Sequence, residues 1–206
     1  YIRSGFRHIA KIIGQDFCFD KEQVFDSLFM LFEEYPRNVF NRFFEKFQIE
    51  YSEELIQKFV EEYRKHFPDI QFYDDVLPCL AELKSLGIKT GIITDGYATA
   101  QRQKLKAVEA EKYFDEIIVT DELGREYWKP HPKAFELMRE RLNVAFNEMV
   151  YVGDNLEKDF HAPNRLGMRS VLITRLDGIY KKENVSVNTI QAQHSIFTFD
   201  SLIALI

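Results

Sequence analysis

Two carboxylates that closely follow an apolar run are the first residues in this sequence that could do chemistry. The run 149–152 ends at Gly153, and Asp154 and Asp159 come next in the sequence GDNLEKD. Isolated charges beside a buried strand are costly, so we expect something to neutralise them. Magnesium is often held by one or two protein carboxylates together with water and phosphate. We therefore predict that Asp154 and Asp159 are Mg²⁺ ligands; the alternative is a helix cap at Asp154 or Asn155 and a surface acid at Asp159.

A second candidate is the sequence Thr94-Asp95-Gly96, which comes after the β-branched run 88–93. If it opens a helix, its amides point outward at the positive end of the helix dipole, where phosphate commonly binds. Gly96 lets the backbone approach a ligand closely. We predict that Thr94, Asp95 and Gly96 bind phosphate; the alternative is an ordinary strand-to-helix turn with Thr or Asp as its cap.

Lys129 is the third candidate, because it lies between Trp128 and Pro130, with Pro132 two residues further on. The prolines stiffen the segment and hold the lysine in one place. A fixed ammonium group is suited to neutralising phosphate charge. The alternative is a solvated loop lysine.

The elements that must position these residues alternate between helix and strand from residue 71 onward. The pattern predicts helices at 75–86, 97–108, 132–142 and 157–166, and strands at 88–94, 116–120, 149–152 and 169–173. A last short helix is expected at 201–206, capped by Asp200, and a loop or irregular strand pair at 177–194. Such alternation predicts an α/β fold with a parallel sheet covered on both faces. Ligands bind beyond the carboxyl ends of such strands, so the candidate residues should meet at one edge.

Residues 1–70 predict a block of helices with no strand. Apolar and aromatic residues recur there at helical spacing, which indicates core packing. Asp20, with Gln23 three residues later, and Ser52 are suited to cap two of these helices.

Composition excludes several classes of protein. The net charge of −6 argues against a nucleic-acid surface, and no apolar run reaches the roughly 18 residues of a membrane span. The two cysteines, Cys18 and Cys79, form no disulfide framework, so we expect a cytoplasmic protein. The sequence leaves the oligomeric state open.

Because the first residue is Tyr1 and not methionine, we expect the natural chain to begin earlier.

Three segments, TDG at 94–96, WKPHPKAFE at 128–136 and VGDNLEKD at 152–159, resemble the second, third and fourth motifs of the haloacid dehalogenase (HAD) superfamily. The resemblance runs from about residue 73 to the end of the chain. It implies a Rossmann-like parallel core at 71–206 and a helical cap at 1–70. It also implies a magnesium-dependent phosphatase that acts on a small phosphorylated metabolite, which the cap residues would select.

The resemblance further implies a role for each candidate residue. An aspartate nucleophile would form an aspartyl-phosphate, which water then hydrolyses. Thr94 and the amides of Asp95 and Gly96 would hold phosphate oxygens, and Lys129 would offset negative charge. Asp154 would ligate Mg²⁺, and Asp159 would be a second ligand or would orient Lys129.

One motif of the family does not occur in the sequence. The first motif, Asp-x-Asp-x-Thr, supplies the nucleophile and the general acid/base, and none of the 206 residues matches it. We expect the strand that carries it to come from a segment outside this sequence and to lie between the strands that end at Thr94 and Gly153. Those two strands should then not be hydrogen-bonded to each other. Two alternatives stay open: a catalytically inactive HAD-like binding protein, and a metal-free 2-haloacid dehalogenase.

Overall fold

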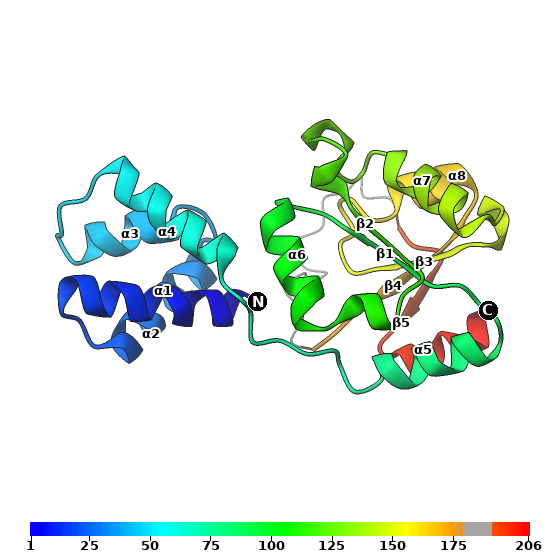
Figure 1. Ribbon diagram of the computed structural model, residues 1–206, viewed down its shortest axis with the longest axis horizontal. Coiled ribbons are helices and arrows are strands. Elements are labelled where there is room, and N and C mark those ends of the chain that lie inside the picture. Colours follow the sequence, from blue (N-terminus) through cyan, green and yellow to red (C-terminus); the bar gives the residue numbers. More distant parts are fainter. Residues whose placement is uncertain (177, 179–190) are drawn as a thin grey trace. The chain divides into compact units, whose positions relative to one another are not determined.

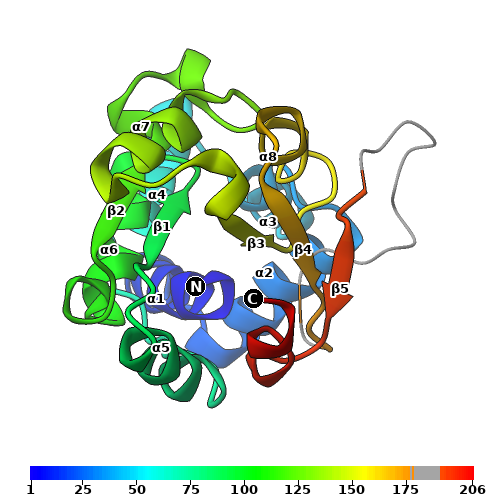
Figure 2. The same cartoon turned by 90° about the vertical axis from the view of Figure 1, so that its right-hand side faces the viewer.

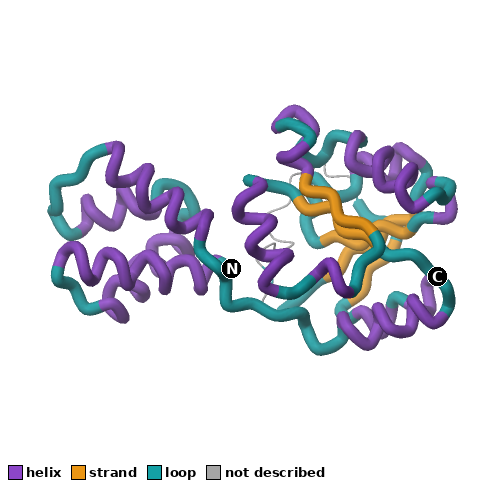
Figure 3. The backbone as a smooth tube through the Cα atoms, viewed as in Figure 1, coloured by secondary structure: helices purple, strands orange, loops and turns teal. Residues whose placement is uncertain are grey.

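The computed structural model describes residues 1–176, 178 and 191–206. The chain forms two compact units, residues 1–71 with 102–108 and residues 72–101 with 109–206. All the described strands lie in the second unit (Figure 3). No helix in the described part of the chain is both long and apolar enough to cross a membrane.

The first unit contains four helices: α1 (Ile2–Phe17), α2 (Lys21–Glu34), α3 (Val39–Lys46) and α4 (Glu53–Lys65). Both predicted caps are confirmed. Asp20 Oδ1 accepts the amides of Glu22 and Gln23 at 3.0 Å, and Ser52 Oγ accepts the amide of Leu55 at 3.3 Å. The apolar faces of the helices form one core, whose largest fully buried side chains are Ile9, Ile13, Leu28, Phe43, Phe44 and Phe59.

The second unit has the predicted α/β fold with parallel strands (Figure 1). Its strands are β1 (Gly91–Thr94), β2 (Glu116–Val119), β3 (Val150–Gly153), β4 (Arg169–Ile173) and β5 (His194–Ile196). Its helices are α5 (Val76–Ser85), α6 (Ala98–Ala107), which continues into the residues grouped with the first unit, α7 (Lys133–Leu142) and α8 (His161–Leu166). Short 3₁₀ turns complete it: η1 (Ala110–Lys112), η2 (Thr120–Glu122), η3 (Arg125–Tyr127), η4 (Phe146–Glu148), η6 (Phe199–Ser201) and η7 (Ile203–Leu205).

The strands are grouped into two sheets that share no hydrogen bonds within the described residues. β1 pairs with β2, and the second sheet has the order β3-β4-β5. Figure 2 shows the pair β1-β2 on one side and β3, β4 and β5 on the other. The prediction that the strands ending at Thr94 and Gly153 are not paired with each other is therefore confirmed.

Helices cover both faces of the strands, which explains why the strands are so apolar. Val150 and Val152 face the cluster of Cys79 and Leu83 from α5. Tyr151, which points to the opposite face because side chains alternate along a strand, packs with residues of α7 and α8. On α7, the residues Ala134, Met138 and Leu142 recur at helical spacing and pack against Ile93 and Ile118.

Two predicted elements begin three and four residues later in the structure, because local hydrogen bonds engage the residues expected to start them. The strand predicted from residue 88 begins at Gly91, since the Ile88 amide donates to the Leu83 carbonyl at 2.9 Å and the Thr90 amide to the Asp115 carboxylate at 2.7 Å. The helix predicted from residue 157 begins at His161, because the preceding loop folds around the side chain of Asp159.

The predicted C-terminal helix is wrong, because residues 199–205 form the two 3₁₀ turns η6 and η7. Asp200 lies inside η6 and does not cap it. The Phe199 amide is instead satisfied by Asp75, whose Oδ2 accepts it at 2.7 Å. Most of the segment 177–194, predicted as a loop or strand pair, lies outside the described residues.

Candidate active site

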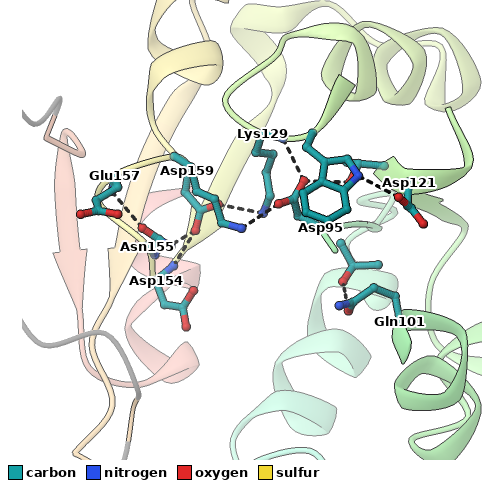
Figure 4. A network of polar contacts seen from close by, with 12 residues as sticks. Asp95, Gln101, Asp121, Lys129, Asp154, Asn155, Glu157 and Asp159 are labelled. Atoms are coloured by element: carbon teal, nitrogen blue, oxygen red, sulfur yellow. Dashed lines mark hydrogen bonds and ion pairs between the residues drawn. The ribbon is translucent and has the colours of Figure 1, made fainter. Parts of the chain in front are cut away.

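The centre of the site is a buried ion pair between the Lys129 ammonium and the Asp159 carboxylate. The two groups lie 2.8 Å apart, and the side chains are only 9% and 3% exposed. Lys129 Nζ also donates to the Tyr151 hydroxyl at 3.1 Å, and that hydroxyl donates to Asp159 at 3.3 Å. Lys129 lies after η3, whereas Asp159 lies after β3, so the pair joins two loops that are distant in the sequence (Figure 4).

This environment fixes the charge on Lys129. Burial by itself would lower the pKa of Lys129, but Tyr151 and Asp159 outweigh that effect and raise the pKa above its ordinary value. For Tyr151, burial disfavours the charged phenolate and raises the pKa to about 12. At neutral pH the site therefore contains a permanent ammonium and a neutral phenol.

Asp159 is fully occupied by donors. One of its oxygens binds Lys129 and Tyr151, and the other accepts the amides of Asp154 at 3.2 Å and Asn155 at 2.9 Å. Gly153 makes this packing possible, because a Cβ at that position would lie 2.7 Å from Asp159 Oδ2 and 2.9 Å from its Cβ and Cγ. In this arrangement Asp159 orients Lys129 and holds the loop after β3.

Asp154 is placed differently, although it is only five residues away. Its side chain is exposed, and no other described residue donates a hydrogen bond to its carboxylate. Although Asp154 is solvent-exposed as a residue, desolvation by the surrounding protein atoms, followed by the charge of Asp159, raises the pKa of its carboxyl above its ordinary value. An unshared carboxylate beside a second one has the chemistry of a hard-cation ligand.

Asp95 is buried at the carboxyl end of β1 and has three donors. Its Oδ1 accepts the Lys129 amide and the Thr120 hydroxyl, both at 2.8 Å, and its Oδ2 accepts the Lys158 ammonium at 2.7 Å. Burial by itself would raise the pKa of Asp95, but the hydrogen bonds from Lys158, Lys129 and Thr120 lower it overall. The carboxylate of Asp95 therefore holds the site together, while its backbone remains next to Thr94 and Gly96.

The loop between β1 and α6 is held by its own contacts. The Thr94 hydroxyl donates to Gln101 Oε1 at 2.7 Å, and Gly96 has a φ of +121°, which strongly favours glycine. The first amide of α6, that of Ala98, donates to Asp121 Oδ2 at 2.8 Å. The start of this helix was predicted to bind an anion, but its first amide is already capped by the carboxylate of Asp121. The backbone amides that precede the helix, those of Asp95 and Gly96, therefore remain the candidates for binding phosphate.

The structure therefore links the candidate residues through side chains that the sequence alone did not single out. Lys129 contacts Asp159 directly, Asp154 adjoins Asp159 through its amide, and Thr94 precedes the anchored Asp95. The linking residues are polar: Thr120 directly after β2, Tyr151 within β3 and Lys158 in the loop after β3. Thr120 has a detectable sequence signal, since it is the first polar residue after an apolar strand, and Tyr151 is marked by its position between two valines.

No group of three or more His, Cys, Asp or Glu side chains among the described residues is placed to hold a metal ion. The acids present, Asp154 and the donor-saturated Asp159, match a magnesium site only if other ligands come from substrate, water or further residues. The exposed, unshared carboxylate of Asp154 is consistent with such a site.

Comparison with known proteins shows which family the chain resembles. A profile of the family described as haloacid dehalogenase-like hydrolase matches residues 31–173. A glyceraldehyde 3-phosphate phosphatase of Methanopyrus kandleri is 41% identical over 109 residues, which are 53% of this chain and 46% of that protein. A protein of the same name from Methanocaldococcus jannaschii is 35% identical over 134 residues, 65% of this chain and 54% of that protein.

A solved structure matches this chain along most of its length. The crystal structure of a HAD phosphatase from Thermococcus onnurineus superposes with a TM-score of 0.60 at 28% identity, covering 97% of this chain and 87% of that one. The chain spans about half the length of the two curated relatives, 46% and 54%. The profile match includes β1 to β4 and all three motif segments. The chain belongs to the haloacid dehalogenase-like hydrolase family.

Proposed function

We propose that the intact protein is a magnesium-dependent phosphatase that acts on a small phosphorylated metabolite. The observation that carries the proposal is the buried Lys129–Asp159 pair, 2.8 Å long, beside the exposed carboxylate of Asp154. A fixed cation next to an unshared acid is suited to a phosphate group with its metal ion. The relatives named glyceraldehyde 3-phosphate phosphatase make that compound the first substrate to assay.

In the proposed mechanism, an aspartate from outside these 206 residues attacks phosphorus, the ester P–O bond breaks and the alcohol part of the metabolite leaves. Water then hydrolyses the aspartyl-phosphate, which releases inorganic phosphate and restores the aspartate. β1 and β3 are each the edge strand of their own sheet, and they are not paired with each other. This arrangement supports the proposal that the strand bearing the nucleophilic aspartate lies between them. Residues 1–70 would form the helical cap that selects the substrate, and residues 71–206 the core.

The proposal assigns tasks to the candidate residues predicted from the sequence. The Lys129 ammonium offsets the negative charge of nucleophile and phosphoryl group. Thr94, with the amides of Asp95 and Gly96, binds phosphate oxygens. Asp154 would hold Mg²⁺, with Asp159 as a second ligand or, as its donors favour, the residue that orients Lys129. The ion would supply charge neutralisation at the phosphoryl oxygens.

The test is hydrolysis of a generic aryl phosphate, and of glyceraldehyde 3-phosphate, by the intact protein. Activity should disappear with a chelator and return when Mg²⁺ is added. Halide release from a 2-haloacid that does not depend on metal would instead support the dehalogenase alternative. Binding of phosphate without any turnover would support the inactive binding protein.

A further inference from the structure

The proposed function gives no task to Lys158, a charged residue at this site. It lies in the turn before Asp159, and its side chain is 29% exposed. Its ammonium is 2.7 Å from Asp95 Oδ2, whose side chain is 4% exposed. The pair therefore joins a partly solvated lysine to a buried acid in a different part of the fold.

Two lysine–aspartate pairs cross between the two sheets in opposite directions. Lys129, in the loop after β2, reaches Asp159 in the loop after β3. Lys158, in the loop after β3, reaches back to Asp95 in the loop after β1. Since β1 and β3 share no hydrogen bonds within the described residues, these pairs connect the two halves at the edge where the site lies.

Lys158 also completes the set of hydrogen bonds that the Asp95 carboxylate accepts. Oδ1 of that carboxylate has two donors, Thr120 and the Lys129 amide, whereas Lys158 is the described donor to Oδ2. Without the ammonium, a buried carboxylate oxygen would be unpaired, which is costly enough to move the side chain or its loop. An uncompensated negative charge would also lie beside the backbone proposed to bind phosphate.

We propose that Lys158 is a positioning residue that holds Asp95, and with it residues 94–96, in the geometry that binds the phosphate group. Lys158 acts through Asp95 and does not itself touch the substrate. This inference rests on the proposed function for the identity of the ligand.

The test measures binding of inorganic phosphate to the intact protein by calorimetry in the presence of Mg²⁺, together with kcat and KM for an aryl phosphate. Lys158→Met should weaken phosphate binding about tenfold, and Lys158→Arg, which keeps the charge, should bind within about twofold of the wild type. The matched control is Lys112→Met, which removes an exposed ion pair with Glu109, and it should leave affinity unchanged.

A double-mutant cycle distinguishes positioning from direct contact. In an Asp95→Asn background, Lys158→Met should cost little further affinity, because no carboxylate remains to be held. An equal loss in both backgrounds would show that Lys158 contacts the anion itself and would overturn the proposal, as would wild-type affinity in Lys158→Met. If phosphate binds and the cycle behaves as expected but no ester is hydrolysed, the proposed function fails while the role of Lys158 stands.

Discussion

The Lys129 ammonium and the Asp159 carboxylate form a buried ion pair 2.8 Å long, and each is also bonded to the Tyr151 hydroxyl. Removing one member of a buried pair leaves the other charged and unpaired, which costs about 3–5 kcal/mol. Lys129→Met should therefore lower the free energy of unfolding by about that amount, as measured by urea denaturation.

The control for this variant is the double substitution Lys129→Met with Asp159→Asn. The double variant removes the unpaired negative charge of Asp159, so it should recover part of the lost free energy of unfolding while activity stays absent. If the single variant is as stable as the wild type, the pair is not buried in the way the structure describes.

Gly153→Ala should disturb the same carboxylate without changing any charge. The added Cβ would lie 2.7 Å from Asp159 Oδ2, so either β3 or Asp159 must move. We expect a loss of about 1–3 kcal/mol in stability and a clear loss of phosphatase activity. Gly87→Ala is the comparison, because its Cβ would meet nothing within 4 Å at a φ of +73°. It should cost about 1 kcal/mol through backbone strain and leave activity intact.

The reach of prediction from sequence depends on how local the signal is. Helix caps such as Asp20 and Ser52 were predictable because a single side chain satisfies nearby amides. The failure at Asp200 has the opposite cause, since the amide of Phe199 is satisfied by Asp75, more than a hundred residues away in the sequence. The Lys158–Asp95 pair was unpredictable for the same reason, because only the fold brings a loop after β3 to a loop after β1.

The helical unit should lose stability in mild acid because of His66. Its Nδ1 donates to the Tyr63 carbonyl at 2.5 Å, which leaves Nε2 as a buried acceptor with no partner among the described residues. Burial lowers the pKa of His66, and the neighbouring His8 lowers it further. Below the unfolded pKa of about 6.5, the unfolded chain binds a proton that the folded chain does not, so stability falls as the pH drops towards the folded pKa.

Urea denaturation at about pH 5.5 and about pH 7.5 measures this dependence, with a spectroscopic probe in the helical unit. His66→Gln cannot titrate and should flatten the difference between the two pH values. His194→Gln, at an exposed position in β5, should leave it unchanged. A wild-type protein that is equally stable at both pH values would contradict the assignment.

The measurement that tests the central claim most directly is the magnesium-dependent turnover of an aryl phosphate by Asp154→Asn in the intact protein. Asp154 is exposed directly after β3 and accepts no hydrogen bond from another described residue, so we expect the rate to fall at least about a hundredfold. Glu157→Gln, an exposed acid three residues further on, is the matched control and should keep the wild-type rate. Unchanged turnover and unchanged magnesium dependence in Asp154→Asn would contradict the proposal that this edge of the sheet is a metal-dependent phosphatase site.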